Sequence, residues 1–186
     1  MKKVLSAYAI LLAIVVVGAI VFIYSGLYNV AADKEISDSK RWLLSTTAHH
    51  SVEARVEGIE PPDLDDDELV ESGVAHYDEM CVSCHGAPGV QPGEIAEGLN
   101  PPPPKLAEMD ADEDPRELFW VTKHGIEMTG MPAWGVTHDD ESIWGMVALM
   151  KRFPGMSEHD YKALVDEAAS HHDRNGGHDH DSHEHD

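Results

Sequence analysis

The stretch MCVSCHGAPG, residues 80–89, contains Cys81 and Cys84, the only two cysteines of the chain. Cysteines three positions apart project from the same side of a helical turn. His85 follows the second cysteine directly. Cysteine pairs of this kind occur in redox-active thiol sites, in zinc sites and where haem is attached. The neighbouring sequence distinguishes among these three interpretations.

The first two interpretations lack the features that they require. A thioredoxin-like pair is expected beside a β-α-β pattern, and the chain shows no alternating strand pattern. A structural zinc site needs about four ligands, usually with a second Cys or His pair. The chain has no second cysteine pair, and no His-x₃₋₅-His follows the motif before the C-terminal tail. The remaining interpretation is C-x-x-C-H, the attachment signature of c-type haem. The sequence therefore predicts one haem c, bound covalently through Cys81 and Cys84, with His85 as an iron ligand.

A second iron ligand is expected downstream, and a methionine on a loop is the usual donor. The segment TGMPAWG, residues 129–135, contains Met131. Pro132 favours an extended backbone at Met131, and the glycines on either side allow a tight chain path. Met131 is therefore the preferred second ligand, although core packing is the ordinary role of a methionine. The competing ligands are Met128 first, then Met109 and His124.

Helical periodicity and helix-end signals predict three helices around the motif. The first helix follows the acidic residues 65–68, carries Val74 and Tyr77, and leads into Cys81. The second helix begins at Asp114-Pro115 and stops at Gly125. The last helix begins near Thr137 or Asp139 and stops at Pro154. The segments between them are rich in glycine and proline and are predicted to be loops. We therefore expect an all-α fold of three to four short helices and long loops around a large apolar group.

The N-terminal segment predicts a membrane anchor. Lys2 and Lys3 precede a run without charge from Val4 to Tyr28, which is long enough to cross roughly 30 Å of hydrocarbon. The lysines favour a cytoplasmic N-terminus, so the rest of the chain would lie on the periplasmic side of a bacterial inner membrane. Val30-Ala31-Ala32 also fits a cleavage site of a signal peptide, and that alternative stays open.

The chain is thus divided into four parts by its sequence. Residues 1–30 form the anchor, 31–63 a spacer in which residues 41–56 indicate a short helix, 64–156 the haem domain, and 157–186 a tail expected to be disordered from about residue 171. The tail sequence HHDRNGGHDHDSHEHD suits loosely bound Cu, Ni or Zn, with a solvating acidic tail as the alternative. Its candidate metal ligands are His178, His180, His183 and His185.

The formal net charge of −22 argues against nucleic acid and against anionic lipid headgroups as partners. An acidic surface is suited to redox partner proteins with basic docking surfaces. Solubility alone is an equally good explanation for charge that is spread along the chain.

Three segments together resemble a known family. CVSCH at 81–85, TGMPAWG at 129–135 and the closing helix DDESIWGMVALM at 139–150 are similar to a monohaem class I cytochrome c, in particular to bacterial forms with an N-terminal membrane anchor. The resemblance covers about residues 66–156. It implies the class I cytochrome c fold and one-electron transfer instead of catalysis.

The resemblance also implies particular contacts in the haem domain. Gly73 and Tyr77 of the first helix should cross the last helix near Trp144. A carbonyl of the proline-rich loop, from Pro103 or Pro104, should accept a hydrogen bond from His85. Trp134 and the prolines should line the haem pocket.

The function expected from these features is that of a membrane-tethered cytochrome that carries single electrons between respiratory donors and acceptors. His85 and Met131 would fill both axial positions of the iron, and methionine ligation favours the ferrous form. One alternative is a fixed cytochrome subunit of a larger dehydrogenase or oxidase. Another is a haem-based sensor in which the methionine is displaceable.

Overall fold

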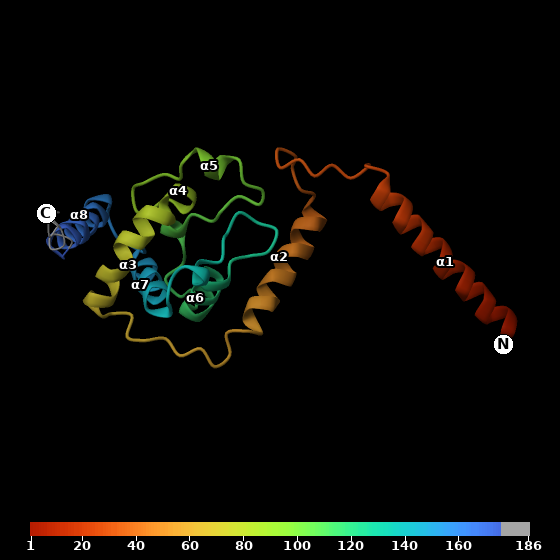
Figure 1. Cartoon of the computed structure of the whole chain (residues 1–186), viewed down its shortest axis with the longest axis horizontal. Helices are drawn as coiled ribbons and strands as arrows, with labels where there is room; N and C mark the ends of the chain where they lie inside the picture. Colours follow the sequence, from red (N-terminus) through yellow and green to blue (C-terminus); the bar gives the residue numbers. More distant parts are fainter. Residues whose placement is uncertain (176–186) are drawn as a thin grey trace, which may run out of the picture. The chain divides into compact units, whose positions relative to one another are not determined.

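The computed structural model describes residues 1–175, and this part of the chain is helical with no strand (Figure 1). The predicted all-α class is therefore confirmed. The chain divides into two compact units between Lys34 and Glu35. The helices are α1 (Lys2–Tyr24), α2 (Asp38–Glu53), α3 (Asp67–Met80), α4 (Val82–His85), α5 (Glu94–Glu97), α6 (Pro115–His124), α7 (Asp140–Arg152) and α8 (Glu158–Asn175), with the 3-10 turns η1 (Leu106–Glu108) and η2 (Trp134–Val136).

The first unit contains α1, a helix of 23 residues with a mean hydropathy of 2.8 over its most apolar window. None of its side chains is buried. At 1.5 Å per residue it is about 35 Å long, which matches the hydrocarbon thickness of a membrane. Length and composition therefore make α1 compatible with a single-pass membrane anchor.

The second unit is organised by the crossing of α3 and α7. Asp66 caps α3 by accepting a hydrogen bond from the backbone N–H of Glu68, and carboxylates in the first turn complement the helix dipole. At the crossing, a Cβ on Gly73 would lie 2.1 Å from the carbonyl carbon of Gly145. The two backbones touch because neither residue has a side chain. This confirms the expected crossing beside Trp144.

The core is formed by the facing sides of α3, α6, α7 and α8. Tyr77 packs edge-on against Phe153 at 5.0 Å between ring centroids. Phe119 of α6 stacks on Trp144 of α7 at 4.1 Å. Burial of such rings is the main stabilising contribution in a small domain. Residues 143–150 of α7 are all buried, so more than two turns of this helix are covered on every side.

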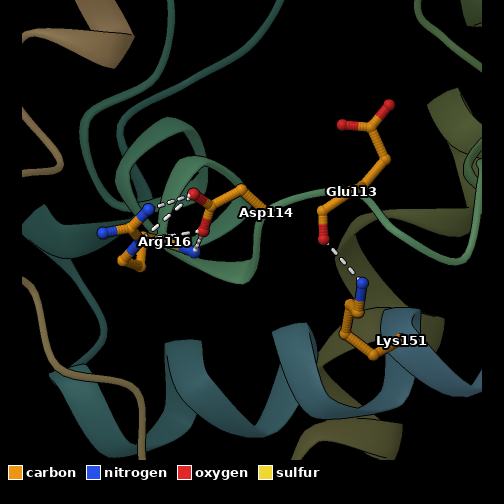
Figure 2. Close-up of polar contacts among 4 residues, drawn as sticks. All are labelled: Glu113, Asp114, Arg116 and Lys151. Atoms are coloured by element: carbon orange, nitrogen blue, oxygen red, sulfur yellow. Dashed lines mark hydrogen bonds and ion pairs between the residues drawn. The ribbon is translucent and has the colours of Figure 1, made fainter.

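The start of α6 is held by polar contacts on two sides (Figure 2). Asp114 caps the helix through the backbone N–H of Arg116, and the Arg116 guanidinium binds the same carboxylate through Nε and through Nη2. Lys151 of α7 donates hydrogen bonds to the backbone carbonyls of Ala111 and Glu113. The loop before α6 is thereby joined to α7. The predicted helix start at Asp114-Pro115 and its end at Gly125 are both confirmed.

The cap of α6 gives a first prediction. Hydrogen bonds from the Arg116 side chain lower the pKa of Asp114 below its usual value. A carboxyl with a lowered folded-state pKa stabilises the protein above its unfolded pKa, about 3.9, and loses this contribution as the pH falls through the folded pKa. Asp114→Ala, which removes both cap and ion pair, should cost about 1 kcal/mol in the free energy of unfolding at neutral pH. Asp114→Asn keeps a capping oxygen and should cost less.

Chemical denaturation at neutral pH and at acid pH measures both variants. The difference between wild type and Asp114→Asn should shrink as the pH falls below about 4, because the carboxyl is then protonated first in the unfolded chain and, at its lowered pKa, in the folded protein. A difference that stays constant with pH would show that the ion pair adds no stability.

The C-terminal part of the haem domain differs from the expected boundaries. The sequence predicts a tail over residues 157–186, whereas α8 packs on α3 and buries Tyr161 and Ala168. Tyr161 also donates a hydrogen bond to Asp78 of α3 at 2.9 Å. The apolar residues 161, 164, 165 and 168 have helical spacing, so the sequence did contain this signal. The helix continues to Asn175, beyond the expected start of disorder at about 171.

The segment expected to be a spacer also differs in part. Its helix, α2, begins and ends three residues earlier than the indicated 41–56. Val52 and Val56 are buried, and α2 contacts α6. The second unit accordingly begins at Glu35. Val52, near the C-terminal end of α2, and Val56, just after the helix, are therefore part of the packed unit.

Candidate haem-binding site

The two cysteines lie where α3 ends and the four-residue helix α4 begins. Cys81 is the C-cap residue of α3. Its carbonyl accepts hydrogen bonds from the N–H groups of Cys84, at 3.1 Å, and of His85, at 2.8 Å. Cys81 is buried, whereas Cys84 is half-buried, and both are free thiols. One helical turn therefore carries both cysteines and places His85 next to Cys84.

Burial, followed by the nearby Cys84, raises the pKa of the Cys81 thiol to about 12. A thiol with this pKa is neutral at physiological pH and is a poor nucleophile. Cys81 therefore lacks the lowered pKa that is typical of a redox-active cysteine. This property argues against the thioredoxin-like interpretation and is compatible with residues that serve as attachment points.

The imidazole of His85 is oriented by the proline-rich loop. Its Nδ1 donates a hydrogen bond to the carbonyl oxygen of Pro104 at 2.8 Å. Because a carbonyl can only accept, Nδ1 carries the proton and Nε2 has a free lone pair. Burial lowers the pKa of His85, and the bond to Pro104 opposes this effect. The ring is therefore suited to bind a metal through Nε2, with the orientation that a carbonyl partner typically enforces.

This hydrogen bond distinguishes between the two prolines named from the sequence. Pro104 supplies the acceptor, and Pro103 is half-buried in the same loop. The carbonyl lies 19 residues beyond His85, so its position depends on the path of the whole intervening loop. The sequence around Pro103 and Pro104 contains nothing that distinguishes one carbonyl from the other as the acceptor for His85.

Several loop contacts that sequence reasoning missed hold the chain after His85. The hydroxyl of Tyr77 donates to the carbonyl of Gly86 at 2.8 Å. Gly86 has a φ of 68°, and a Cβ there would lie 2.6 Å from the carbonyl oxygen of Val90, so the turn requires glycine. Farther on, the N–H of Gly93 donates to the carbonyl of Ser83 at 2.9 Å. The loop is thereby folded back onto α4.

Met131 lies on a second loop, after α6. Its N–H donates to the Thr129 hydroxyl at 3.1 Å, and its carbonyl accepts from Ile126 at 3.3 Å. A Cβ on Gly130 would lie 2.6 Å from Leu99 Cδ2. The loop with Met131 therefore meets the segment that leads to Pro104. Thr129 was a usable signal, because a threonine two residues before Met131 can close a short side-chain turn.

The environments of the competing ligands differ from that of Met131, which is half-buried. Met128 is 92% exposed. Met109 packs against the core. His124 is exposed, with its ring against Trp120 at 4.8 Å. These positions favour Met131 as the second iron ligand, because its side chain is half-buried and is not part of the packed core. Trp134, expected in the pocket wall, is half-buried at the start of η2.

The residues of this site fit a covalently attached haem. Two separate thiols and a neutral imidazole with a free Nε2 are the donors that c-type attachment requires. Residues 80–93 contain no charged side chain at all, which suits a large apolar ring system. Among residues 1–170, the part of the chain whose side chains the structure describes, no group of three or more His, Cys, Asp or Glu side chains is placed to hold a metal ion. The tail residues His178, His180, His183 and His185 lie outside the described residues.

The helical fold and the C-x-x-C-H turn define a c-type monohaem cytochrome domain. The model of the family described as cytochrome c oxidase, cbb3-type, subunit III matches residues 68–150. The matched segment contains both cysteines, His85, Pro104 and Met131. No curated protein matches the chain. These residues are therefore a c-type cytochrome domain with covalently bound haem c, and such a domain transfers electrons and is not a catalytic enzyme.

Proposed function

We propose that this protein is a membrane-tethered electron carrier whose iron has His85 and Met131 as axial ligands. The contact between Gly130 and Leu99 carries the proposal, because it joins the loop of Met131 to the loop that orients His85. Haem held in this way supplies one-electron chemistry between the ferric and ferrous states. Cys81 and Cys84 keep the group attached, and Pro104 holds the proton of His85 on Nδ1.

The other parts of the chain support this role. The helix α1 suits anchoring in the inner membrane of a bacterium, with the haem domain on the periplasmic side. The net charge of −22 would orient the domain on basic surfaces of donors and acceptors in the respiratory chain, with an attraction that weakens as salt rises. Interactions of this kind are brief, as repeated electron delivery requires.

Replacing Met131 tests the ligation. Met131→Leu should remove the far-red band that methionine–ferric iron ligation produces and should lower the reduction potential, on the order of 100 mV. The physical reason is that thioether ligation stabilises the ferrous form. Met128→Leu is the matched control, because that side chain is 92% exposed, and it should change neither property. Absorption spectra and a redox titration of the purified proteins provide the measurement.

The same proteins test the sensor alternative. Ferrous wild type should not bind carbon monoxide, because both axial positions are filled, whereas Met131→Leu should bind it. Carbon monoxide binding by wild type would contradict a permanently bound methionine. If Met128→Leu and not Met131→Leu removed the far-red band, the ligand would be Met128.

A fixed subunit of a larger oxidoreductase is the second candidate. The observation that favours it is the family match, since that family is described as subunit III of a cbb3-type cytochrome c oxidase. Mild detergent extraction followed by size-exclusion chromatography distinguishes the candidates. A free carrier should elute alone, whereas a subunit should co-elute with other haem-containing chains at constant stoichiometry.

A further inference from the structure

The N-terminal end of α2 carries three large apolar side chains that the domain leaves exposed. Trp42 is 67% exposed, Leu43 56% and Leu44 53%. At the opposite end of the same helix, Val52 is 8% exposed, and α2 contacts α6. We call Trp42, Leu43 and Leu44 the apolar end of α2. Three adjacent exposed residues of this size suggest a surface that another body covers.

Packing within the domain does not account for the apolar end. Leu44, Ala48 and Val52 share one face of the helix, and this face is increasingly buried towards Val52. At 100° per residue, Leu43 points about 100° and Trp42 about 160° away from that face. These two side chains therefore point away from the stripe that packs in the domain. Their burial requires a different partner.

The charges beside the apolar end suit a lipid surface. Lys40 and Arg41 directly precede Trp42, and residues 39–52 contain no Asp or Glu. This stretch is basic in a chain whose net charge is −22. Long cationic side chains can reach lipid phosphates while their stems lie along apolar surface. Tryptophan is enriched at the boundary between headgroups and hydrocarbon.

The connection to α1 keeps this end of α2 close to a membrane. The inference rests on the proposed anchoring of α1. Helix α1 ends at Tyr24 and α2 begins at Asp38, so residues 25–37 join them. A flexible chain of this length has a root-mean-square extension of about 20 Å. Even a weak affinity for the surface would then be sufficient, because tethering makes the local concentration high.

We propose that the apolar end of α2 inserts into the headgroup region of the membrane that α1 spans, with Lys40 and Arg41 on lipid phosphates. The other end of α2 packs in the haem domain, so this contact would hold the domain at a defined height above the lipid. The contact would restrict the motion of the haem domain relative to the membrane surface. Although the net charge of −22 disfavours binding to anionic lipid headgroups, residues 39–52 carry positive charge and no Asp or Glu, so this segment can bind them.

Tryptophan fluorescence of the full chain in lipid nanodiscs tests the insertion. Lipids with brominated acyl chains quench only tryptophans near the hydrocarbon, and α1 contains no tryptophan. Brominated nanodiscs should lower the emission of wild type relative to unbrominated ones. The Trp42→Phe variant should lose this lipid-dependent quenching. The double change Lys40→Gln and Arg41→Gln should reduce the quenching in discs with anionic lipid, because the phosphate contacts are lost.

Other outcomes overturn the proposal in recognisable ways. Equal emission in both kinds of disc, or quenching that persists in Trp42→Phe, would show that Trp42 does not reach the lipid. Absence of lipid quenching together with a dimer that Trp42→Phe dissociates would make the apolar end an interface between two copies. If the haem absorbance does not migrate with the discs at all, the anchoring itself fails. Migration with the discs and no quenching would leave the anchored carrier intact and reject only the α2 contact.

Discussion

Replacing both Cys81 and Cys84 by alanine should abolish covalent haem and with it the folded haem domain. The chain has no other cysteine, so no second thiol can form a thioether. The loops on either side of α6 contain little regular structure, and a bound haem would supply apolar surface for them to pack on. Without that group, a small domain loses a large part of its buried apolar surface.

Denaturing gel electrophoresis followed by haem staining measures the attachment, and far-ultraviolet circular dichroism measures the remaining helix. Each single cysteine variant should keep one thioether and remain stained. Ser83→Ala is the matched control in the same turn, because Ser83 is exposed and its hydroxyl donates only a long bond to Cys84 Sγ. A double variant that still stains for haem would contradict the assignment of both attachment residues.

Gly73→Ala should have the second large effect, a loss of about 3 kcal/mol or more in the free energy of unfolding. A Cβ at Gly73 would lie 2.1 Å from the carbonyl carbon of Gly145 and 2.4 Å from the backbone nitrogen of Met146. Both atoms belong to the backbone of a buried helix, so α3 and α7 would have to separate. Glycine to alanine within a helix is otherwise favourable by about 1 kcal/mol, which makes the expected sign specific to the crossing.

Gly98→Ala provides the control for this substitution. The nearest atom to a Cβ at Gly98 is the carbonyl oxygen of Ile95 at 3.7 Å, an ordinary contact. Thermal or chemical unfolding should therefore show little change for Gly98→Ala. Equal stability of the Gly73→Ala and Gly98→Ala variants would mean that the helices do not touch at Gly73.

The features that could be predicted from the sequence are those with local signals. The starts of α3, α6 and α7 follow from capping aspartates, Asp66, Asp114 and Asp139, whose side chains bind N–H groups two or three residues away. The haem attachment signature lies within five consecutive residues.

Long-range contacts required the tertiary structure. Gly145 is the partner of Gly73 because two whole helices cross at these residues, and the contact between Leu99 and Gly130 depends on the paths of two loops. The packing of α8 on α3 was missed for a different reason. The apolar residues of α8 are few and lie among polar residues. The surface of α3 on which they pack is known only from the tertiary structure, in which Tyr161 donates a hydrogen bond to Asp78.

The sequence by itself determined that the chain carries an all-helical haem domain, that residues 81–85 have the C-x-x-C-H pattern typical of haem attachment, and that an apolar segment precedes the domain. The tertiary structure decided that the carbonyl of Pro104 accepts a hydrogen bond from His85 Nδ1, that the loop of Met131 meets Leu99 just before the proline-rich loop, and that α2 leaves Trp42 exposed. The physical reason is the range of the interactions. Caps and attachment motifs act over a few residues, whereas the position of a carbonyl 19 residues away follows from the packing of every segment between.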